Sequence, residues 1–495
     1  MRPPDGQPLL VDSPYTRREL ALHGRAGVRR STRALPTPST PEIMEDPMQQ
    51  ATPISDAATR FIAGASQRRY SPEVLDAAKM CLVDWFGVAI GAANEPAARA
   101  VRRVAQSWGP KGRAHMLLGP AVSPASAALA NGTMAHCMDY DDTHLDGAGH
   151  ISAPTWAASL ALAEEHGKTE GEALAAFITG FETSARLGGT GFGRKLQYQG
   201  FHPSSVFGRF AAAAAACVLL GLDRARIAHA LGVAATTASG LNASFGTMSK
   251  PFHLGKAAMD GMLAADLARE GFEAATHLLD APNGLSGTLV QDGSVKLEPV
   301  EFTDGLALLR NAYKPYACCK ATHACVDAAR ELSAKLKPAE IERIVLGASP
   351  MTLRVAAKPD PRTPLEGKFS VAYCAALGLS GHPAVEGDFT ETRLRDPGLR
   401  ALMAKSEVAE QPGTELTEGF VEVRLTDGRS LRADVPLALG NPGNPMSWAG
   451  MEGKFAGLVE PALGKDTRTL FEALRRFEEP GTLAKVMTML TRAAH

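Results

Sequence analysis

The sequence has few cysteines and no excess of charge of either sign. Its seven cysteines are an odd number among 495 residues, and none forms a Cys-x-x-Cys pair, so neither a disulfide framework nor a common zinc pattern is indicated. Lysine and arginine (52) nearly balance aspartate and glutamate (53). Without a net field, neither nucleic acid nor an anionic membrane is expected as a partner. We expect reduced thiols and a cytoplasmic location.

Long apolar runs are also missing. No segment reaches the roughly 18 uninterrupted apolar residues that a membrane helix needs. The closest run, over 210–222, is rich in alanine and is typical of a buried helix. A length of 495 residues exceeds an ordinary single core and indicates two domains.

The first 47 residues differ in composition from the rest. They contain seven arginines and a cluster of prolines, which is typical of chain that cannot bury enough apolar surface to fold. We therefore predict a disordered N-terminal extension over 1–47. A transit peptide and a mis-assigned start codon are alternative interpretations, whereas the apolar stretch of a secretory signal is missing.

From residue 52 onward, apolar residues recur with helical spacing. Ser71-Pro72-Glu73 combines an N-cap residue with proline at the first helical position and predicts a helix through about residue 90. We predict a helical domain (N-terminal part) over 48–310, with weak strand signals. Its further helices are expected over 123–138, 154–166, 169–187, 205–220, 223–240 and 256–270.

The pattern changes after residue 310. Residues 341–346 are rich in β-branched side chains, and residues 420–425 and 430–435 flank Asp427-Gly428, the signal of a tight hairpin. With helices expected over 321–336 and 368–379, this predicts an α+β lid domain over 311–440. Residues 441–495 look helical again and are predicted to return to the helical domain. The predicted fold class is mainly α: a large all-helical domain with a smaller α+β lid inserted before a C-terminal helical tail.

The densest polar segment spans 136–150. It holds Asp139, Asp141 and Asp142, and carboxylates this close ionise together only where cations or hydrogen bonds offset their charges. Such crowding often marks a site whose protonation is tuned for catalysis. A solvated acidic loop is one alternative, and a metal site is another. The candidate ligands are Asp141, Asp142 and Asp146 for magnesium, and His136, His144 and His150 for zinc.

Four further segments place basic or polar side chains where an anion could bind. His202 precedes a proline at a helix start, where backbone N–H groups are free. Lys250 comes before another helix, and a buried lysine binds carboxylates as a point charge. The segment 314–323, bounded by Lys314 and His323, falls at the proposed domain junction, where clefts form. Its Cys318-Cys319 pair is interpreted as buried packing. In the fourth segment, Lys368 and Tyr373 could reach a ligand. The alternatives are a helix cap for His202, a surface basic loop for Lys250 and an ordinary helix start for the segment with Lys368 and Tyr373.

Together and in this order, these segments resemble the MmgE/PrpD family over roughly residues 52–490. That family includes 2-methylcitrate dehydratase, cis-aconitate decarboxylase and iminodisuccinate epimerase. The resemblance rests on Asp139-Tyr-Asp-Asp-Thr143-His, Gly200-Phe-His202-Pro, Lys250-Pro, Lys314-Pro-Tyr-Ala-Cys-Cys with Thr322-His323, Lys368-Phe-Ser-Val-Ala-Tyr373 and Asn444-Pro-Met446.

The resemblance implies a homodimeric enzyme that needs no metal or organic cofactor and acts on a small polycarboxylate by proton transfer next to a carboxylate. A 2-methylcitrate dehydratase-like lyase is the first expectation. A cis-aconitate decarboxylase-like or iminodisuccinate epimerase-like activity is the alternative, and a metal-dependent enzyme using the Asp139–Asp146 cluster is a further one. The chain departs from the decarboxylase pattern at Cys319, where animal decarboxylases carry a histidine, and in the length of the segment before His150.

The resemblance also implies roles for particular residues. In our hypothesis His202 and Asp139 handle protons, while Lys250, Lys314 and His150 hold carboxylates. A histidine can take or give the proton, and lysines can stabilise enediolate charge without a metal. The predicted catalytic residues are thus Asp139, His202, Lys250 and His150, and the predicted substrate-binding residues are Thr143, Lys314, His323, Lys368 and Tyr373.

Overall fold

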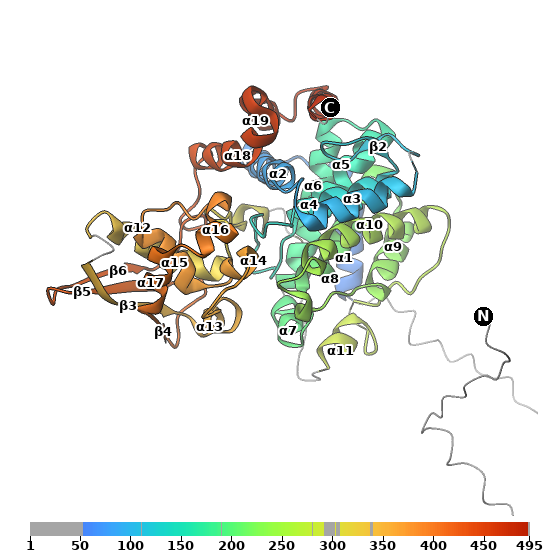
Figure 1. Ribbon diagram of the computed structural model, residues 1–495. Helices are drawn as coiled ribbons and strands as arrows, with labels where there is room; N and C mark the ends of the chain where they lie inside the picture. Colours follow the sequence, from blue (N-terminus) through green and yellow to red (C-terminus); the bar gives the residue numbers. More distant parts are fainter. Residues whose placement is uncertain are drawn as a thin grey trace, which may run out of the picture. The chain divides into compact units, whose positions relative to one another are not determined.

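In the computed structural model the chain divides after Asp46, and all described residues belong to the unit Pro47–His495. The disordered extension predicted over 1–47 lies outside the described residues. Within the second unit the structure describes residues 53–109, 111–189, 191–279, 281–291, 302, 307–336 and 340–493. This part is mainly helical with a small sheet portion, which confirms the predicted fold class (Figure 1).

The first half of the described chain forms a helical assembly. Ser71 caps its second helix by accepting a hydrogen bond from the Val74 N–H, as its sequence predicted. The helices are α1 (Pro53–Ala63), α2 (Pro72–Gly91), α3 (Pro96–Ser107), α4 (Pro124–Met134), α5 (Ser152–His166), α6 (Glu170–Gly189), α7 (Phe192–Tyr198), α8 (Pro203–Leu220), α9 (Arg224–Thr236), α10 (Ser249–Arg269) and α11 (Leu285–Val290). A two-residue strand pair that the sequence did not predict, β1 (Ala114–His115) with β2 (Ala121–Val122), lies between α3 and α4.

Helix α8 is central to this assembly and packs against α5, α6 and α10. It is the one helix among the described residues long and apolar enough to cross a membrane, but 89% of it is buried inside the protein. Small residues let the helices approach closely: a Cβ on Gly255 of α10 would lie 2.1 Å from the Leu129 carbonyl oxygen of α4. This contact brings the start of α10, with Lys250, close to the loop after α4.

The second half contains a four-stranded sheet in the order β4-β3-β5-β6. Strands β5 (Gly419–Leu425) and β6 (Ser430–Val435) form the predicted antiparallel hairpin, with Gly428 at positive φ in its turn. β3 (Ile341–Ala348) pairs with both β5 and β4 (Ser406–Glu410), and β4 runs parallel to it. The helices around the sheet are α12 (His323–Ser333), α13 (Pro350–Val355), α14 (Pro364–Gly367), α15 (Val371–Leu379), α16 (Glu391–Leu394) and α17 (Pro397–Ala404).

The last helices pack on the first ones. α18 (Trp448–Leu463) lies along α2, as Figure 1 also shows, and Trp448 Nε1 donates to Asp76 of that helix. α19 (Thr467–Arg475) also contacts α2, and the N–H of Leu483 in α20 (Thr482–Arg492) donates to Glu170 of α6. The chain therefore leaves the helical assembly, forms the sheet and comes back, whereas the exact domain limits stay predictions.

Candidate active site

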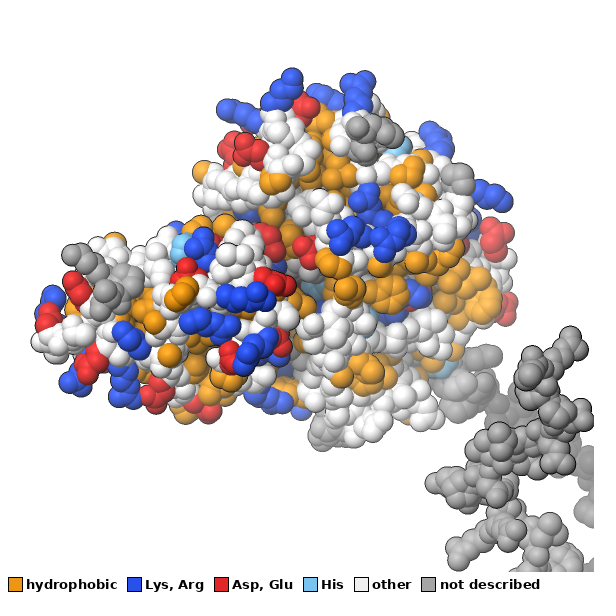
Figure 2. All heavy atoms as spheres, in the orientation of Figure 1, with side chains coloured by type: hydrophobic (Ala, Val, Ile, Leu, Met, Phe, Trp, Pro, Cys, Tyr) orange, Lys and Arg blue, Asp and Glu red, His pale blue; other side chains and the backbone are white. Residues whose placement is uncertain are grey.

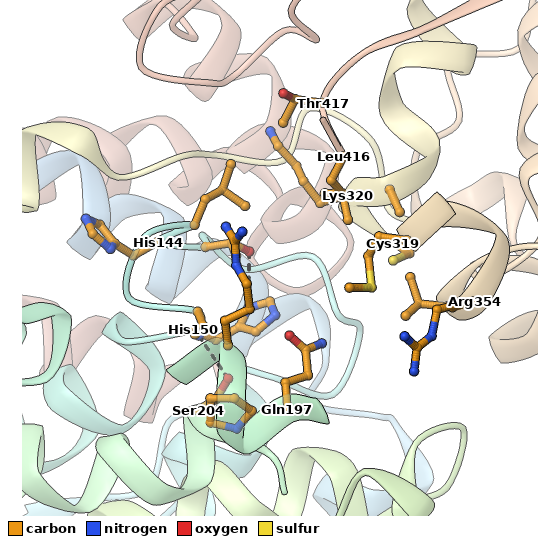
Figure 3. Close-up of a pocket in the computed structure, with 18 of the residues that line it drawn as sticks. His144, His150, Gln197, Ser204, Cys319, Lys320, Arg354, Leu416 and Thr417 are labelled. Carbon is orange, nitrogen blue, oxygen red and sulfur yellow. Dashed lines mark hydrogen bonds between the residues drawn. The ribbon is translucent and has the colours of Figure 1, made fainter. Parts of the chain in front are cut away.

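A cavity of about 570 Å³ lies beside the loop that follows α4. One part of its lining comes from the helical assembly and the other from segments around the sheet. Figure 3 shows His150, Gln197 and Ser204 from the first part, and Cys319, Lys320 and Arg354 from the second. The cavity therefore lies where the predicted helical and lid segments meet.

Asp139 is surrounded by basic side chains in this cavity. Its Oδ1 lies 2.5 Å from Lys250 Nζ, 3.3 Å from Lys314 Nζ and 3.6 Å from His150 Nε2. Burial alone would raise the pKa of Asp139, but the two lysine charges outweigh it and hold the pKa well below its usual range. Burial also opposes the charge of Lys314, yet Asp139 raises the pKa of that lysine. Asp139 is thus a carboxylate at neutral pH.

A second carboxylate orients His150. Asp141 Oδ1 lies 2.9 Å from His136 Nδ1, and its Oδ2 lies 3.1 Å from His150 Nδ1. This leaves His150 Nε2 facing Asp139, while Thr143 Oγ1 lies 3.5 Å from His150 Nδ1. Burial lowers the pKa of His136 to about 3, so its ring is neutral. The pair of aspartates therefore fixes both the position and the orientation of the His150 ring.

His202 lines the cavity at the start of α8. Its Nδ1 lies 3.1 Å from Nδ1 of His253, so one ring donates and the other accepts. Phe245 packs edge-on against it, with ring centroids 4.9 Å apart. Burial, assisted by the charge of Lys250, lowers the pKa of His202 well below its usual value. His202 occupies the N-cap position of α8, but its side chain makes no cap hydrogen bond and lines the cavity instead.

The structure brings most of the predicted site residues together. The solvated-loop interpretations of the segments around Asp139 and Lys250 are wrong, since both side chains are buried. The predicted residues that line the cavity are Asp139, Thr143, His150, His202, Lys250 and Lys314.

The other three predicted residues are not among the described residues that line the cavity. His323 is fully buried, with Nε2 3.2 Å from the Cys318 carbonyl oxygen. The Tyr373 hydroxyl donates to the Asp388 carbonyl at 2.7 Å, and Lys368 is paired with Glu386 at 2.8 Å. Their substrate-binding roles stay predictions. The polar atoms of Lys368 and Tyr373 have protein partners in this conformation, whereas His323 Nδ1 has no hydrogen-bond partner among the described residues.

Sequence reasoning missed three cationic residues of the lining: Arg194, Lys320 and Arg354. Lys320 is buried and donates to the Tyr313 carbonyl at 3.0 Å. Burial, together with the charge of Lys314, lowers its pKa to about 7. Lys320 lies within the polar segment 314–323, so the sequence pattern could have identified it as a site residue. The two arginines lie in no recognised motif.

Cys319 also lines the cavity. Burial, with a smaller effect from Asp139, raises the pKa of its thiol to about 11. A thiol at neutral pH is a poor nucleophile. Cys319 therefore adds shape and a weak hydrogen-bond donor to the cavity.

Two nitrogens and two carboxylates within the site could hold a metal ion. The ligand atoms of His136, Asp139, Asp141 and His150 lie within 4.8 Å of one another. However, Asp139 already faces two ammonium groups that would repel a cation. The zinc set predicted with His144 is not brought together, because His144 Nε2 instead lies 2.9 Å from the Ala307 carbonyl oxygen.

The acids predicted for magnesium are separated in the same way. Asp146 pairs with Arg310 at 2.6 Å. Asp142 accepts from Asn311 Nδ2 at 2.6 Å and from Ser152. Each of these two carboxylates therefore has protein partners of its own.

A mainly helical protein with a buried acid, histidine and lysine site beside a small sheet matches a known family. The MmgE/PrpD N-terminal domain matches residues 56–298 and the MmgE/PrpD C-terminal domain matches residues 316–478. The chain belongs to the MmgE/PrpD family.

Its relatives include cis-aconitate decarboxylases. The one from Aspergillus terreus is 29% identical over 399 residues, which cover 74% of this chain and 81% of the relative. The one from Homo sapiens is 29% identical over 385 residues, with 74% and 79% covered. A cis-aconitate decarboxylase-like protein of Aspergillus oryzae is 26% identical over 399 residues, with 74% and 83% covered.

Proposed function

We propose that this protein is a lyase acting on a small tricarboxylate, with decarboxylation of cis-aconitate as the favoured reaction. The cationic lining of the cavity carries the proposal: three lysines and two arginines face three acids, Asp139, Asp146 and Glu415. Asp139 and Asp146 are already ion-paired. The relatives support the decarboxylase alternative over the 2-methylcitrate dehydratase that the sequence placed first.

The decarboxylation of cis-aconitate consumes one proton and needs no redox partner. CO₂ leaves from the methylene carbon of cis-aconitate, and its bonding electron pair forms a new double bond to the central carbon. The electron pair of the old double bond moves to the vinylic carbon, where the adjacent carboxylate spreads the charge as an enediolate. A proton then adds to this carbon and gives itaconate. Cations must stabilise the enediolate, and an acid must deliver the proton.

The side chains of the cavity fit these two tasks. Lys250 and Lys314 both lie beside Asp139 in the cavity lining and can stabilise carboxylate and enediolate charge. Burial lowers the pKa of His202 and keeps its ring neutral, but a bound polyanion raises the pKa of a neighbouring imidazole. Binding of the substrate would therefore prepare His202 to carry the proton. His150, oriented by Asp141, is the second proton carrier within reach of the same space.

Dehydration of a 2-methylcitrate-like hydroxy acid is the second candidate. The neutral thiol of Cys319 favours it, because Cys319 is the position at which the sequence departs from the decarboxylase pattern of the resemblance. Incubation with cis-aconitate, citrate, 2-methylcitrate and iminodisuccinate, with detection of CO₂ and of product acids, separates the reactions. CO₂ from cis-aconitate alone supports the proposal. Water loss from 2-methylcitrate without CO₂ assigns the dehydratase instead, and an inverted configuration of iminodisuccinate assigns an epimerase.

Binding of a tricarboxylate should weaken as the pH rises through about 7. Lys320, with a pKa of about 7, is charged below that pH and neutral above it, so the cavity then loses one cation. Calorimetric titration with the saturated analogue tricarballylate between pH 6 and 8 should show a several-fold rise in Kd. In Lys320→Met this rise should disappear. An equal pH dependence in both proteins would contradict the role of Lys320.

Turnover should survive removal of metal ions. The ammonium groups on Asp139 disfavour a cation at the four-residue group described above. We expect full activity after exhaustive treatment with EDTA and gel filtration into metal-free buffer. Loss of activity that returns on addition of one divalent metal would assign the metal-dependent alternative.

We also propose a homodimer. Hydrophobic side chains gather on the face formed by α3 and α10 (Figure 2), and large exposed apolar residues suit an interface. They include Val104, Trp108, Phe252 and Leu263. Light scattering coupled to gel filtration should give twice the chain mass, and Leu263→Glu should shift it toward the monomer. A wild-type monomer at micromolar concentration would contradict the proposal.

A further inference from the structure

We infer that three buried lysines from separate segments clamp the backbone over residues 138–140 and thereby hold Asp139 in its working position. Three consecutive carbonyl groups each accept a hydrogen bond from a different ammonium group. The bonds are Lys368 Nζ to the Met138 carbonyl at 2.8 Å, Lys314 Nζ to the Asp139 carbonyl at 2.6 Å and Lys454 Nζ to the Tyr140 carbonyl at 2.7 Å.

The backbone at this point has a conformation that needs support. Asp139 has φ of 53°, the left-handed region that residues other than glycine rarely adopt. Such a conformation costs energy and persists only where the surroundings determine it. Charge-assisted hydrogen bonds to the carbonyl groups of residues 138, 139 and 140 stabilise this backbone conformation.

The clamping lysines are themselves costly to bury, and each has a counter-ion. Lys368 is paired with Glu386 at 2.8 Å, and Lys454 is paired with Asp84 at 2.5 Å. A buried charge without a partner is strongly unfavourable. Lys368 and Lys454 therefore each join an acid of their own surroundings to a carbonyl of the active-site loop, whereas the acid beside Lys314 is Asp139 itself.

Lys368 and Lys454 act on Asp139 from outside the cavity. Neither is among the described residues that line it, so neither contacts a ligand held there in this conformation. Lys368 directly follows α14, and Lys454 belongs to α18, which packs on α2. Asp84 also accepts the backbone N–H of Asp142 at 2.9 Å, so the Asp84–Lys454 pair holds the loop at two points. Both lysines are positioning residues.

The test uses kinetic readouts and rests on the proposed function for its substrate, cis-aconitate. Lys368→Met and Lys454→Met should each lower kcat at least tenfold and leave KM within about twofold, because the substrate-contacting groups remain. A looser Asp139 also pairs less well with Lys250, which raises its pKa. Since Asp139 acts as a carboxylate, the acid limb of the pH–rate profile should move to higher pH in both variants.

Two controls separate positioning from simple stability. Asp84→Asn/Lys454→Met removes both charges of the buried pair, so it should regain most of the thermal stability that Lys454→Met loses, but not the kcat. Lys405→Met removes a lysine that donates to the Ile341 carbonyl at the sheet and should leave kcat unchanged. Wild-type kcat in the double variant would overturn the role of Lys454. A raised KM with unchanged kcat in Lys368→Met would make Lys368 a substrate-binding residue instead.

A failure of the proposed function can be told apart from a failure of the clamp. If the wild-type protein does not convert cis-aconitate, the proposed function fails by itself. Hydrogen–deuterium exchange of the amides over 138–144 then tests the clamp without turnover. Faster exchange in the double variant and in Lys368→Met, but not in Lys405→Met, supports the clamp. Unchanged exchange in all three variants would overturn it.

Discussion

Replacing Lys250 by alanine should lower kcat/KM on cis-aconitate by about 10²–10³-fold or more, the range found when one electrostatic stabiliser is removed from a buried site. Lys250 lies 2.5 Å from Asp139 and lines the cavity. Its loss removes a cation for the substrate and also raises the pKa of Asp139. Initial rates of CO₂ release at saturating and limiting substrate measure the effect.

The matched control for this prediction lies on the same helix. Lys256, about two turns further along α10, pairs with Asp260 and does not belong to the cavity lining. Lys256→Ala should keep wild-type kinetics. Circular dichroism and the melting temperature should show that Lys250→Ala is folded. Wild-type rates in folded Lys250→Ala would remove Lys250 from the mechanism.

His202→Ala should lower kcat by about 10²–10⁴-fold, the range for loss of a general acid or base. KM should change less, because Lys250 and Lys314 still attract the carboxylates. The pH–rate profile should also lose the limb that reports the imidazole in the enzyme–substrate complex. Stopped-time product analysis by chromatography is sensitive enough for the residual rate.

His166 provides the control for the histidine variant. It lies in the last turn of α5 and is exposed, so His166→Ala should behave like the wild type. An added small imidazole should partly rescue His202→Ala, because the truncated side chain leaves space beside Phe245. A kcat within twofold of wild type in His202→Ala would show that another group delivers the proton, and His150 would be the next candidate.

Much of the fold could be predicted from the sequence because its signals are local. The N-cap at Ser71 and the Asp427-Gly428 turn fix local backbone geometry, and both appear as predicted. Strand β4 was missed because Ser406–Glu410 is short and polar and becomes a strand only by pairing with β3. Parallel pairing between distant segments leaves no local pattern.

The sequence predicted those site residues that lie in dense polar segments of the chain. Asp139, His202 and Lys250 lie in dense segments, and folding brings these together. Arg354 stands in a short helix without a recognisable motif, so only the tertiary structure brings it to the cavity. Lys454 belongs to a helix that looks amphipathic in sequence, and its bond to the Tyr140 carbonyl spans 314 positions. Long-range contacts of this kind leave no signature in spacing.

The most direct test of the central claim is proton NMR of cis-aconitate incubated with the wild-type protein in D₂O. The proposed mechanism predicts loss of cis-aconitate, release of one CO₂ per molecule and itaconate that carries a single deuterium on the methylene carbon derived from the vinylic position. Unchanged cis-aconitate, with no deuterium incorporated into it or into any acid of the panel, would contradict proton transfer next to a carboxylate as the activity of this cavity.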